Sequence, residues 1–144
     1  MNITTITKPD YQELIEIWED SVRATHKFLP EDIIASLKPM ILEHYFDAVN
    51  LRGVETNDGQ LIGFVGVANS NIEMLFIASS FRGKGAGTLL LQYAITHQNA
   101  SKVDVNEQNP EALGFYQHHG FKISGRSPLD GQGNPFPLLH LSLN

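Results

Sequence analysis

A glycine-rich segment between a predicted strand and a predicted helix constrains the fold of this chain more than any other feature of its sequence. The segment Phe81-Arg82-Gly83-Lys84-Gly85-Ala86-Gly87-Thr88 follows the predicted strand 72–77. Glycine lets a backbone approach a ligand closely, and the free N–H groups at the start of a helix attract anions. Because Arg82 and Lys84 add positive charge, the segment favours a phosphate or pyrophosphate site over an ordinary glycine-rich turn.

Two common phosphate-binding motifs do not fit this segment. A Walker loop ends in Gly-Lys-Ser/Thr, whereas Lys84 is followed by Gly85. A dinucleotide-binding fingerprint needs a third small residue where Leu90 stands, and an acid about twenty residues further on. Asp104 lies near that distance but gives the fingerprint little support, so we expect a phosphate site of another kind.

The order of predicted elements indicates a mixed sheet. We expect strands at 2–7, 48–55, 60–68, 72–77, 101–106, 121–125 and 137–143, and helices from Pro9, after Pro30, after the glycine-rich segment, and from Asn109 to about Gly120. Asn57-Asp58-Gly59 predicts a hairpin turn. Only the unit of strand, glycine-rich segment, helix and strand requires a parallel crossover. The sequence therefore predicts one α/β (α+β) domain over 1–144, with a mostly antiparallel sheet of about seven strands flanked by about four helices.

Charge is distributed unevenly along the chain. The 144 residues carry 16 acidic and 10 basic side chains, a formal net charge of −6 at pH 7. Residues 1–60 hold 11 acids and five bases and account for the whole of this charge, whereas 74–103 hold no acid. Because an acidic protein repels polyanions, we expect no nucleic-acid partner. The acid-free stretch around Arg82 and Lys84 leaves room for one small anion.

The chain has no cysteine, no long apolar run and no recognisable signal peptide. The lack of cysteine excludes disulfides, thiolate zinc sites and a cysteine nucleophile, and it suits a reducing compartment. No run approaches the roughly 20 apolar residues of a membrane span. The adjacent His118 and His119 do not have the spacing of a metal-chelating pair. We therefore expect a cytoplasmic protein without a metal and without a membrane partner.

A second candidate segment stands at a predicted strand-to-helix junction, within 106–116. Asn109 suits an N-cap, with proline in the first helical position. Asn109, Ala112 and Tyr116 share one helix face, and the small Ala112 would let an extended ligand cross the helix start. The Tyr116 hydroxyl, with an ordinary pKa of about 10, suits protonation of a leaving thiolate or contact with a ligand sulfur. A capping asparagine and a core tyrosine remain the alternative interpretation.

Together the two segments resemble the motifs of the GNAT superfamily of acyl-CoA-dependent N-acetyltransferases. Arg82-x-x-Gly85-x-Gly87 resembles its pyrophosphate loop, and Asn109-x-x-Ala112-x-x-Phe115-Tyr116, followed by Gly120-Phe121, resembles its second motif. The resemblance implies a GNAT-like fold, with acetyl-CoA as cosubstrate and no metal. The residues that it places at the cofactor are Leu75, Phe76, Ile77, Arg82, Gly83, Lys84, Gly85, Ala86, Gly87, Thr88, Asn109, Ala112, Phe115 and Tyr116.

The resemblance also assigns roles to these residues. Amides of the glycine-rich segment would bind the CoA pyrophosphate, and the strand 75–77 would pair with the pantetheine arm and polarise the thioester carbonyl. Tyr116 would be the general acid toward the CoA thiolate. The acceptor amine needs a base, for which Glu73 is the first candidate and His26 the second. Glu73 has an equally simple interpretation as a solvated strand carboxylate.

The acceptor is expected to be a primary amine of a small molecule or a peptide. The acidic residues 1–60 include the helices that usually wall the acceptor pocket in this family, which suggests a cationic amine, although a solvated helix face explains the same charges. Possible aromatic walls of this pocket are Trp18, Phe28, Tyr45 and Phe46, with Trp18 also suited to the core. Two alternatives stay open: a non-catalytic CoA- or acyl-CoA-binding sensor or interaction module, and an O-acetyltransferase.

Overall fold

The computed structural model describes residues 1–143 and shows seven strands in one mixed sheet. The strands are β1 (Asn2–Thr5), β2 (Asn50–Glu55), β3 (Leu61–Ala68), β4 (Asn71–Ile77), β5 (Lys102–Asn106), β6 (Phe121–Ser127) and β7 (Leu138–Leu143). The helices are α1 (Tyr11–Thr25), α2 (Glu31–Met40), α3 (Ala86–His97) and α4 (Pro110–His118). The order across the sheet is β1-β2-β3-β4-β5-β7-β6, with β4 and β5 as the parallel pair. The predicted fold class is confirmed.

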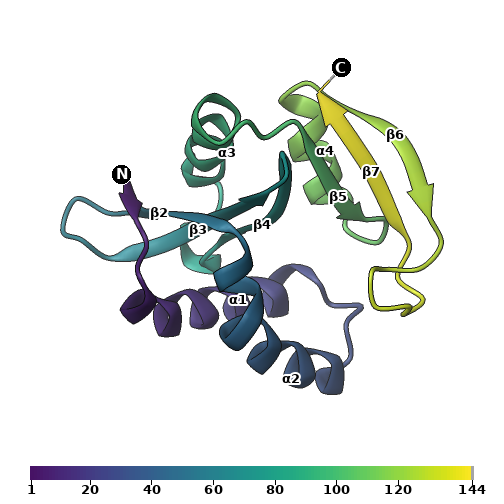
Figure 1. Ribbon diagram of the computed structural model, residues 1–144, viewed down its shortest axis with the longest axis horizontal. Helices are drawn as coiled ribbons and strands as arrows, with labels where there is room; N and C mark the ends of the chain where they lie inside the picture. Colours follow the sequence, from purple (N-terminus) through teal and green to yellow (C-terminus); the bar gives the residue numbers. More distant parts are fainter. Residues whose placement is uncertain (144) are drawn as a thin grey trace.

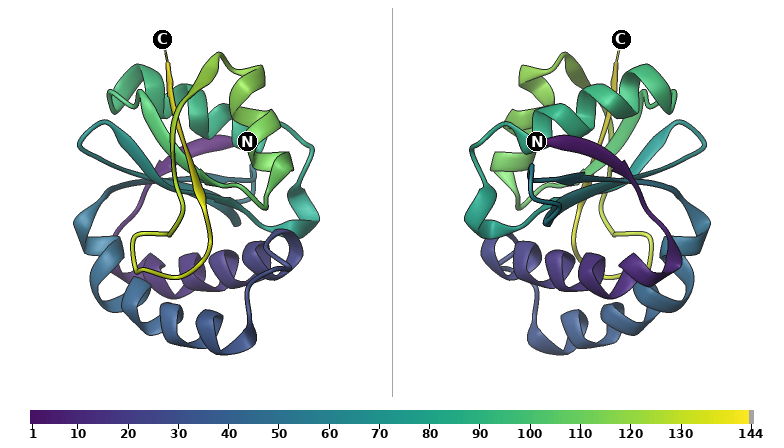
Figure 2. Two further views of the ribbon diagram at one scale, coloured as in Figure 1. Left: turned by 90° about the vertical axis from the view of Figure 1, so that its right-hand side faces the viewer. Right: turned by 90° about the vertical axis from the view of Figure 1, so that its left-hand side faces the viewer.

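Helices cover both faces of the sheet (Figures 1 and 2). The pair α1 and α2 lies on one face, and the pair α3 and α4 lies on the other. Residues 62–67 of β3 are buried without interruption because α1 packs on one side of this strand and α3 on the other. The sheet therefore separates two apolar cores, one under each helix pair.

The hydrophobic periodicity of α1 determines which of its faces meets the sheet. Leu14, Trp18 and Val22 are 0%, 4% and 2% exposed, whereas Glu13 and Glu16 are exposed. The four-residue spacing thus places one apolar stripe on the sheet and leaves the acids in solvent. Trp18 belongs to this core.

The sheet is split beyond the first residues of β4. Strands β4 and β5 pair through only two positions, Asn71 with Lys102 and Ile72 with Val103. Just after them Glu73 forms a β-bulge, because Gly66 pairs with Met74 and Val67 pairs with Ile72. The bulge bends β4 and reverses the face of the sheet to which the following side chains point. Ile72 therefore packs in the α3 core and Met74 in the α1 core. Figure 1 shows the two strands diverging from this point.

Two local details differ from the predicted elements. Strand β1 ends at Thr5 instead of position 7, because Thr7 N–H donates to the Asp10 carboxylate and opens a 3₁₀ turn, η1 (Lys8–Asp10). Helix α2 continues as a π-helical segment, η2 (Ile41–Tyr45), and a 3₁₀ turn, η3 (Phe46–Ala48). This irregularity follows Pro39, which lacks a backbone donor inside the helix. No helix in residues 1–143 is both long and apolar enough to cross a bilayer.

Candidate active site

The split sheet opens into a cleft with a volume of about 530 Å³. Its walls come from β4 on one side, β5 and α4 on the other, and the start of α3 at one end. Because β4 and β5 separate after Ile72 and Val103, the cleft exposes backbone that a paired sheet would bury. A strand edge of this kind binds extended ligands through main-chain hydrogen bonds.

The backbone of β4 offers two residues to this cleft. Ala78 N–H donates to Ile62 O at 2.8 Å, on the β3 side of the strand. Backbone polar groups alternate sides along a strand, so Phe76 also faces β3, whereas Leu75 and Ile77 face the cleft. All of the predicted residues 75–77 line the cleft, but Leu75 and Ile77 are the ones with free backbone groups there.

The glycine-rich segment forms a turn that leads into α3 as predicted. Gly83 and Gly85 have φ values of +74° and +92°, which strain any residue with a Cβ. Gly85 precedes the first helical residue, so the amides that follow it point away from the helix at its positive end. A Cβ on Gly87 would meet the Phe115 ring at 3.5 Å, an ordinary contact.

The charged and small side chains of the segment differ in their positions. Arg82 lines the cleft and forms an ion pair with Glu111 of α4, also at the cleft wall. Thr88 lines the cleft as well, whereas Ala86 is buried beneath the turn. Lys84 does not line the cleft, and its Nζ lies 5.7 Å from the centroid of the Phe81 ring. Arg82 is therefore the better placed of the two cations.

The second predicted segment lies on the opposite wall. Asn109 is buried, and its Oδ1 accepts a hydrogen bond from Ala112 N at 3.3 Å, so its capping role is real. It also lines the cleft together with Ala112, Phe115 and Tyr116. A capping role and a place at the ligand site are thus compatible for Asn109.

Tyr116 combines a core position with contact to the cleft. Its side chain is 6% exposed and packs edge-on against Phe115 and Phe121. Within residues 1–143 its hydroxyl has no hydrogen-bond partner, and the residue lines the cleft. Burial raises the pKa of the Tyr116 phenol above its usual 10, which keeps the hydroxyl a proton donor at neutral pH.

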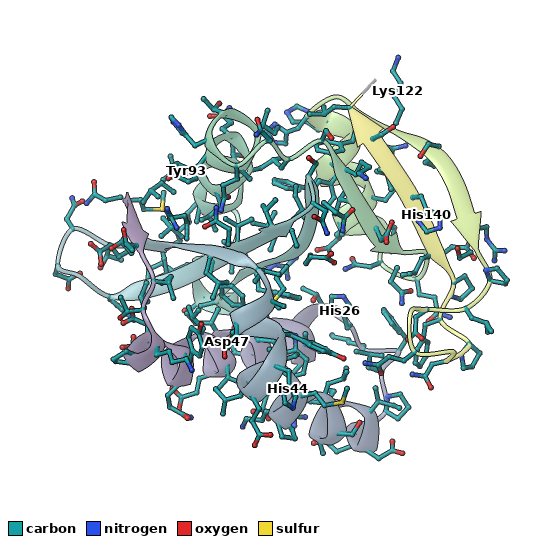
Figure 3. The ribbon with its side chains drawn as sticks, in the orientation of Figure 1. His26, His44, Asp47, Tyr93, Lys122 and His140 are labelled. Atoms are coloured by element: carbon teal, nitrogen blue, oxygen red, sulfur yellow. The ribbon has the colours of Figure 1, made fainter. Side chains whose placement is uncertain are left out.

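The two predicted base candidates line the same cleft from different elements. Glu73 occupies the bulge of β4 and is exposed. His26 follows the last residue of α1, and burial lowers its pKa below the usual 6.5. Figure 3 shows His26 at this helix end. The imidazole is therefore neutral near pH 7.

A pair of hydrogen bonds determines the tautomer of His26. Thr25 Oγ1 donates its proton to Ser21 O at 2.8 Å and lies 2.7 Å from His26 Nδ1. Because a hydroxyl has a single proton, Thr25 can only accept from His26, so Nδ1 carries the imidazole proton. The lone pair is then on Nε2, which gives His26 a free basic nitrogen.

A second cavity of about 460 Å³ adjoins the cleft. Its walls are the segment between α1 and α2, the helical segment α2–η2, and the loop between β6 and β7. Three residues line both spaces: His26, Asp104 and Asn106. Of the suggested aromatic walls, Phe28 and Tyr45 line this cavity, whereas Trp18 and Phe46 are wrong for it because both are buried in the α1 core.

Asp104 and Asn106 were not predicted as site residues. The alternation of β5 carried a signal for Asp104, since Val103 and Val105 are buried on the core face and Asp104 therefore projects from the other. In the part of the chain that the structure describes, no group of three or more His, Cys, Asp or Glu side chains is arranged to hold a metal ion.

The split sheet, the glycine turn at a helix start and the tyrosine across the cleft together define an acyl-CoA-binding acetyltransferase. The family model of the acetyltransferase (GNAT) domain matches residues 16–136, and this chain belongs to that family. It is an enzyme that transfers an acetyl group from acetyl-CoA to an amine, as predicted, and the expectation of a GNAT fold is confirmed.

Two relatives match this chain over most of their own length. The chain is 36% identical to peptidyl-lysine N-acetyltransferase YjaB of Salmonella typhimurium over 141 residues, which are 98% of this chain and 97% of the relative. It is 37% identical to YjaB of Escherichia coli K12, over 91% and 88% of the two chains. The solution structure of apo YjaB from Escherichia coli superposes with a TM-score of 0.88, 34% identity, and coverage of 99% and 96%. A PaiA N-acetyltransferase from Thermoplasma acidophilum, solved with coenzyme A, shares the fold at a TM-score of 0.76, 20% identity, and coverage of 99% and 98%.

Proposed function

We propose that this enzyme acetylates lysine side chains of peptides or proteins by direct attack of the amine on acetyl-CoA. The observation that carries the proposal is the meeting of the two spaces at His26, Asp104 and Asn106. One space fits an extended thioester arm, and the other admits an acceptor from the opposite side of the split sheet. The names of the two YjaB relatives, both peptidyl-lysine N-acetyltransferases, support the acceptor class.

We further propose how the chain holds the cosubstrate. The amides that follow Gly85, together with Arg82, bind the pyrophosphate, because they present positive charge at a helix start. The free backbone groups of Leu75 and Ile77 pair with the pantetheine amides. A free N–H on this edge also binds the thioester oxygen as negative charge develops on it. Asn109 and Ala112 contact the arm from the α4 side.

In the proposed reaction, the residues of this chain move two protons. Bound acetyl-CoA supplies a thioester carbonyl as the electrophile. His26 Nε2 takes one proton from the acceptor ammonium, so the neutral amine can attack and form a C–N bond. Tyr116 gives its phenolic proton to the sulfur as the C–S bond breaks, and it recovers a proton from the new amide nitrogen. His26 then releases its proton to solvent, and Glu73 is the competing base.

The test is an acceptor assay read by release of free thiol and by mass spectrometry of the product. Peptides with one internal lysine and a blocked N-terminus should be acetylated on Nε, and the same peptides with norleucine should not. Acetylation of free N-termini or of small amines, with lysine peptides unmodified, would contradict the proposal and leave the acetyltransferase assignment intact.

We also propose that residues 1–144 work as one acetyltransferase domain in the cytoplasm. The single sheet to which both ends of the chain contribute supports the first statement, since β1 and β7 both belong to it. The lack of cysteine and the dependence on acetyl-CoA support the second.

A further inference from the structure

We propose that Asp104, held in place by His140, binds the ammonium group of the acceptor where the two spaces meet, and that the acceptor is an unbranched alkylammonium. This inference rests on the proposed function, because it assumes that the second cavity receives the acceptor. Asp104 would act as a specificity-determining residue and His140 as a positioning residue.

Asp104 lies at the point where the sheet splits. Val103 is the last residue of β5 that pairs with β4, so Asp104 is the first without a partner on that side. Its neighbours Val103 and Val105 are buried on the α3 face, and the Asp104 side chain therefore projects from the other face. Of the three residues that line both spaces, Asp104 is the one with a negative charge.

A hydrogen-bonded chain of three side chains fixes this carboxylate. Asp104 and His140 are direct partners across β5 and β7, and His140 Nδ1 lies 2.6 Å from Asp104 Oδ1. On the far side, His140 Nε2 lies 2.6 Å from Ser127 Oγ of β6. Gly125, the partner of His140 on β6, has no side chain to displace the ring. Figure 3 shows His140 at this position on β7.

The hydrogen bond from His140 leaves half of the carboxylate available. Among residues 1–143 the partner of Asp104 is His140 through Oδ1, and Oδ2 has none. A carboxylate that is anchored through one oxygen presents the other in a defined direction, which suits an N⁺–H donor. Ser127 and His140 extend away from the cleft, so they position Asp104 and do not reach the reacting atoms.

The second acid of the cavity is less suited to this role. Both oxygens of Asp130 are engaged in its own loop: Oδ1 accepts from Gln132 N at 3.0 Å and Asn134 N at 2.9 Å, and Oδ2 accepts from Asn134 Nδ2 at 3.5 Å. Asp130 therefore shapes the loop between β6 and β7. Among the described residues that line the second cavity, Asp104 is the acid with a carboxylate oxygen that has no hydrogen-bond partner.

The walls of the second cavity determine the shape of the acceptor. Phe28 contacts Phe136 with ring centroids 5.8 Å apart, and His26 contacts Phe28 at 5.4 Å. These rings form an apolar part of the wall of the cavity that Asp104 also lines. A methylene chain packs well on such walls while its ammonium reaches the carboxylate. Lysine and other linear alkylamines have this form, whereas amines with branched or anionic groups next to nitrogen do not.

The experiment compares matched charge-removing variants in the acetyl-transfer assay. Asp104→Asn should raise the KM for a lysine peptide about tenfold or more, the loss expected when a charged hydrogen bond is removed, with acetyl-CoA affinity unchanged. Asp32→Asn, at an exposed site in the first turn of α2, removes the same charge and should leave KM within about twofold. Equal KM values for the Asp104→Asn variant and the native enzyme would overturn the proposal.

His140 is tested by a pair of variants. His140→Leu should raise the acceptor KM severalfold with little change in kcat, because Asp104 loses its anchor. His140→Asn keeps a donor near the Nδ1 position and should restore most of the affinity. Equal effects of both variants would indicate a structural role only and would contradict the positioning role.

A binding measurement separates this inference from the proposed function. With CoA saturating, the native enzyme should bind the lysine peptide more tightly than its norleucine analogue, and Asp104→Asn should lose that preference. If the native enzyme acetylates lysine but Asp104→Asn keeps the preference, the ammonium site is wrong and the function stands. If the native enzyme neither binds nor acetylates lysine peptides, the proposed function itself fails.

Discussion

At the scale of single residues, Tyr116 is the side chain whose environment best matches a proton-donating role. Its ring is held by Phe115 and Phe121, and the residue lines the cleft. Because burial raises its pKa, the phenol stays protonated in the ground state and is available to donate a proton to the thiolate that develops as the C–S bond breaks.

Replacing Tyr116 with phenylalanine tests this role with minimal change in packing. We expect Tyr116→Phe to lower kcat by about 10²–10⁴-fold, the usual contribution of general acid catalysis, with an unchanged dissociation constant for acetyl-CoA. Steady-state kinetics and calorimetric titration measure the two quantities. Tyr93→Phe, at a half-buried position of α3 that does not line the cleft, is the control and should have native rates. An unchanged kcat for Tyr116→Phe would remove this residue from the acid role.

His26 predicts how activity and stability depend on pH. Burial lowers its folded pKa below the 6.5 of the unfolded chain, so the unfolded state binds a proton more readily. The stability that neutral His26 contributes is complete above pH 6.5 and falls as the pH decreases toward the folded pKa. The acid limb of kcat/KM should therefore lie below pH 6.5.

The comparison of His26→Gln with Glu73→Gln identifies the base. We expect the acid limb of the pH–rate profile to disappear in His26→Gln and to persist in Glu73→Gln. Urea unfolding between pH 5 and 8 should show a smaller loss of stability toward low pH in His26→Gln than in the native enzyme. The reverse pattern of kinetics would assign the base to Glu73.

At the scale of elements, two glycines at the start of α3 differ in how much the fold needs them. Gly85 has a φ of +92°, so Gly85→Ala strains the backbone and should lower the free energy of unfolding by about 1–2 kcal/mol, with weaker acetyl-CoA binding. Gly87 lies inside the first turn of α3, where alanine is the better helix former and a Cβ has room beside Phe115. Gly87→Ala should therefore leave stability unchanged or slightly raised. Equal losses in the two variants, measured by urea unfolding, would contradict this distinction.

Elements defined by local pattern could be predicted from the sequence, and contacts between distant segments could not. The four-residue spacing of Leu14, Trp18 and Val22 is a local pattern that indicates the buried face of α1, and the glycine-rich segment predicted the start of α3. The bulge at Glu73 has no local signature, because it depends on pairing with β3.

The second cavity shows the same limit more clearly. Phe28 meets Phe136 in its wall, and Asp104 of its lining is joined to His140 and Ser127 of two further strands. Each of these side chains is unremarkable in its own segment. Their chemistry depends on the strand order β5-β7-β6, which places the last two strands of the chain beside the middle of it. Long-range pairing of this kind leaves no periodic signal in the sequence.

At the scale of the whole molecule, the sheet consists of two halves with little direct pairing. Strands β1–β4 form one half and β5–β7 the other, and two residue pairs between β4 and β5 connect them. The α3 core, which contains residues from both halves such as Val65 and Val105, supplies a further connection. A ligand that pairs with β4 inside the split would therefore join the two halves.

This arrangement predicts where acetyl-CoA slows amide hydrogen exchange. At 100 times its dissociation constant, acetyl-CoA should raise the free energy of unfolding by about 2.7 kcal/mol. Beyond that global effect, exchange should slow most at Leu75 and Ile77, whose N–H groups face the cleft, and less at Phe76, which faces β3. Adenosine 3′,5′-bisphosphate, which lacks the pantetheine arm, is the matched control and should leave Leu75 and Ile77 unprotected. Stabilisation by ATP or NAD but not by acetyl-CoA would contradict the cofactor site. Equal protection of Leu75 and Phe76 would contradict only the orientation of the β4 backbone, because strand geometry allows one of these two residues, not both, to face the split.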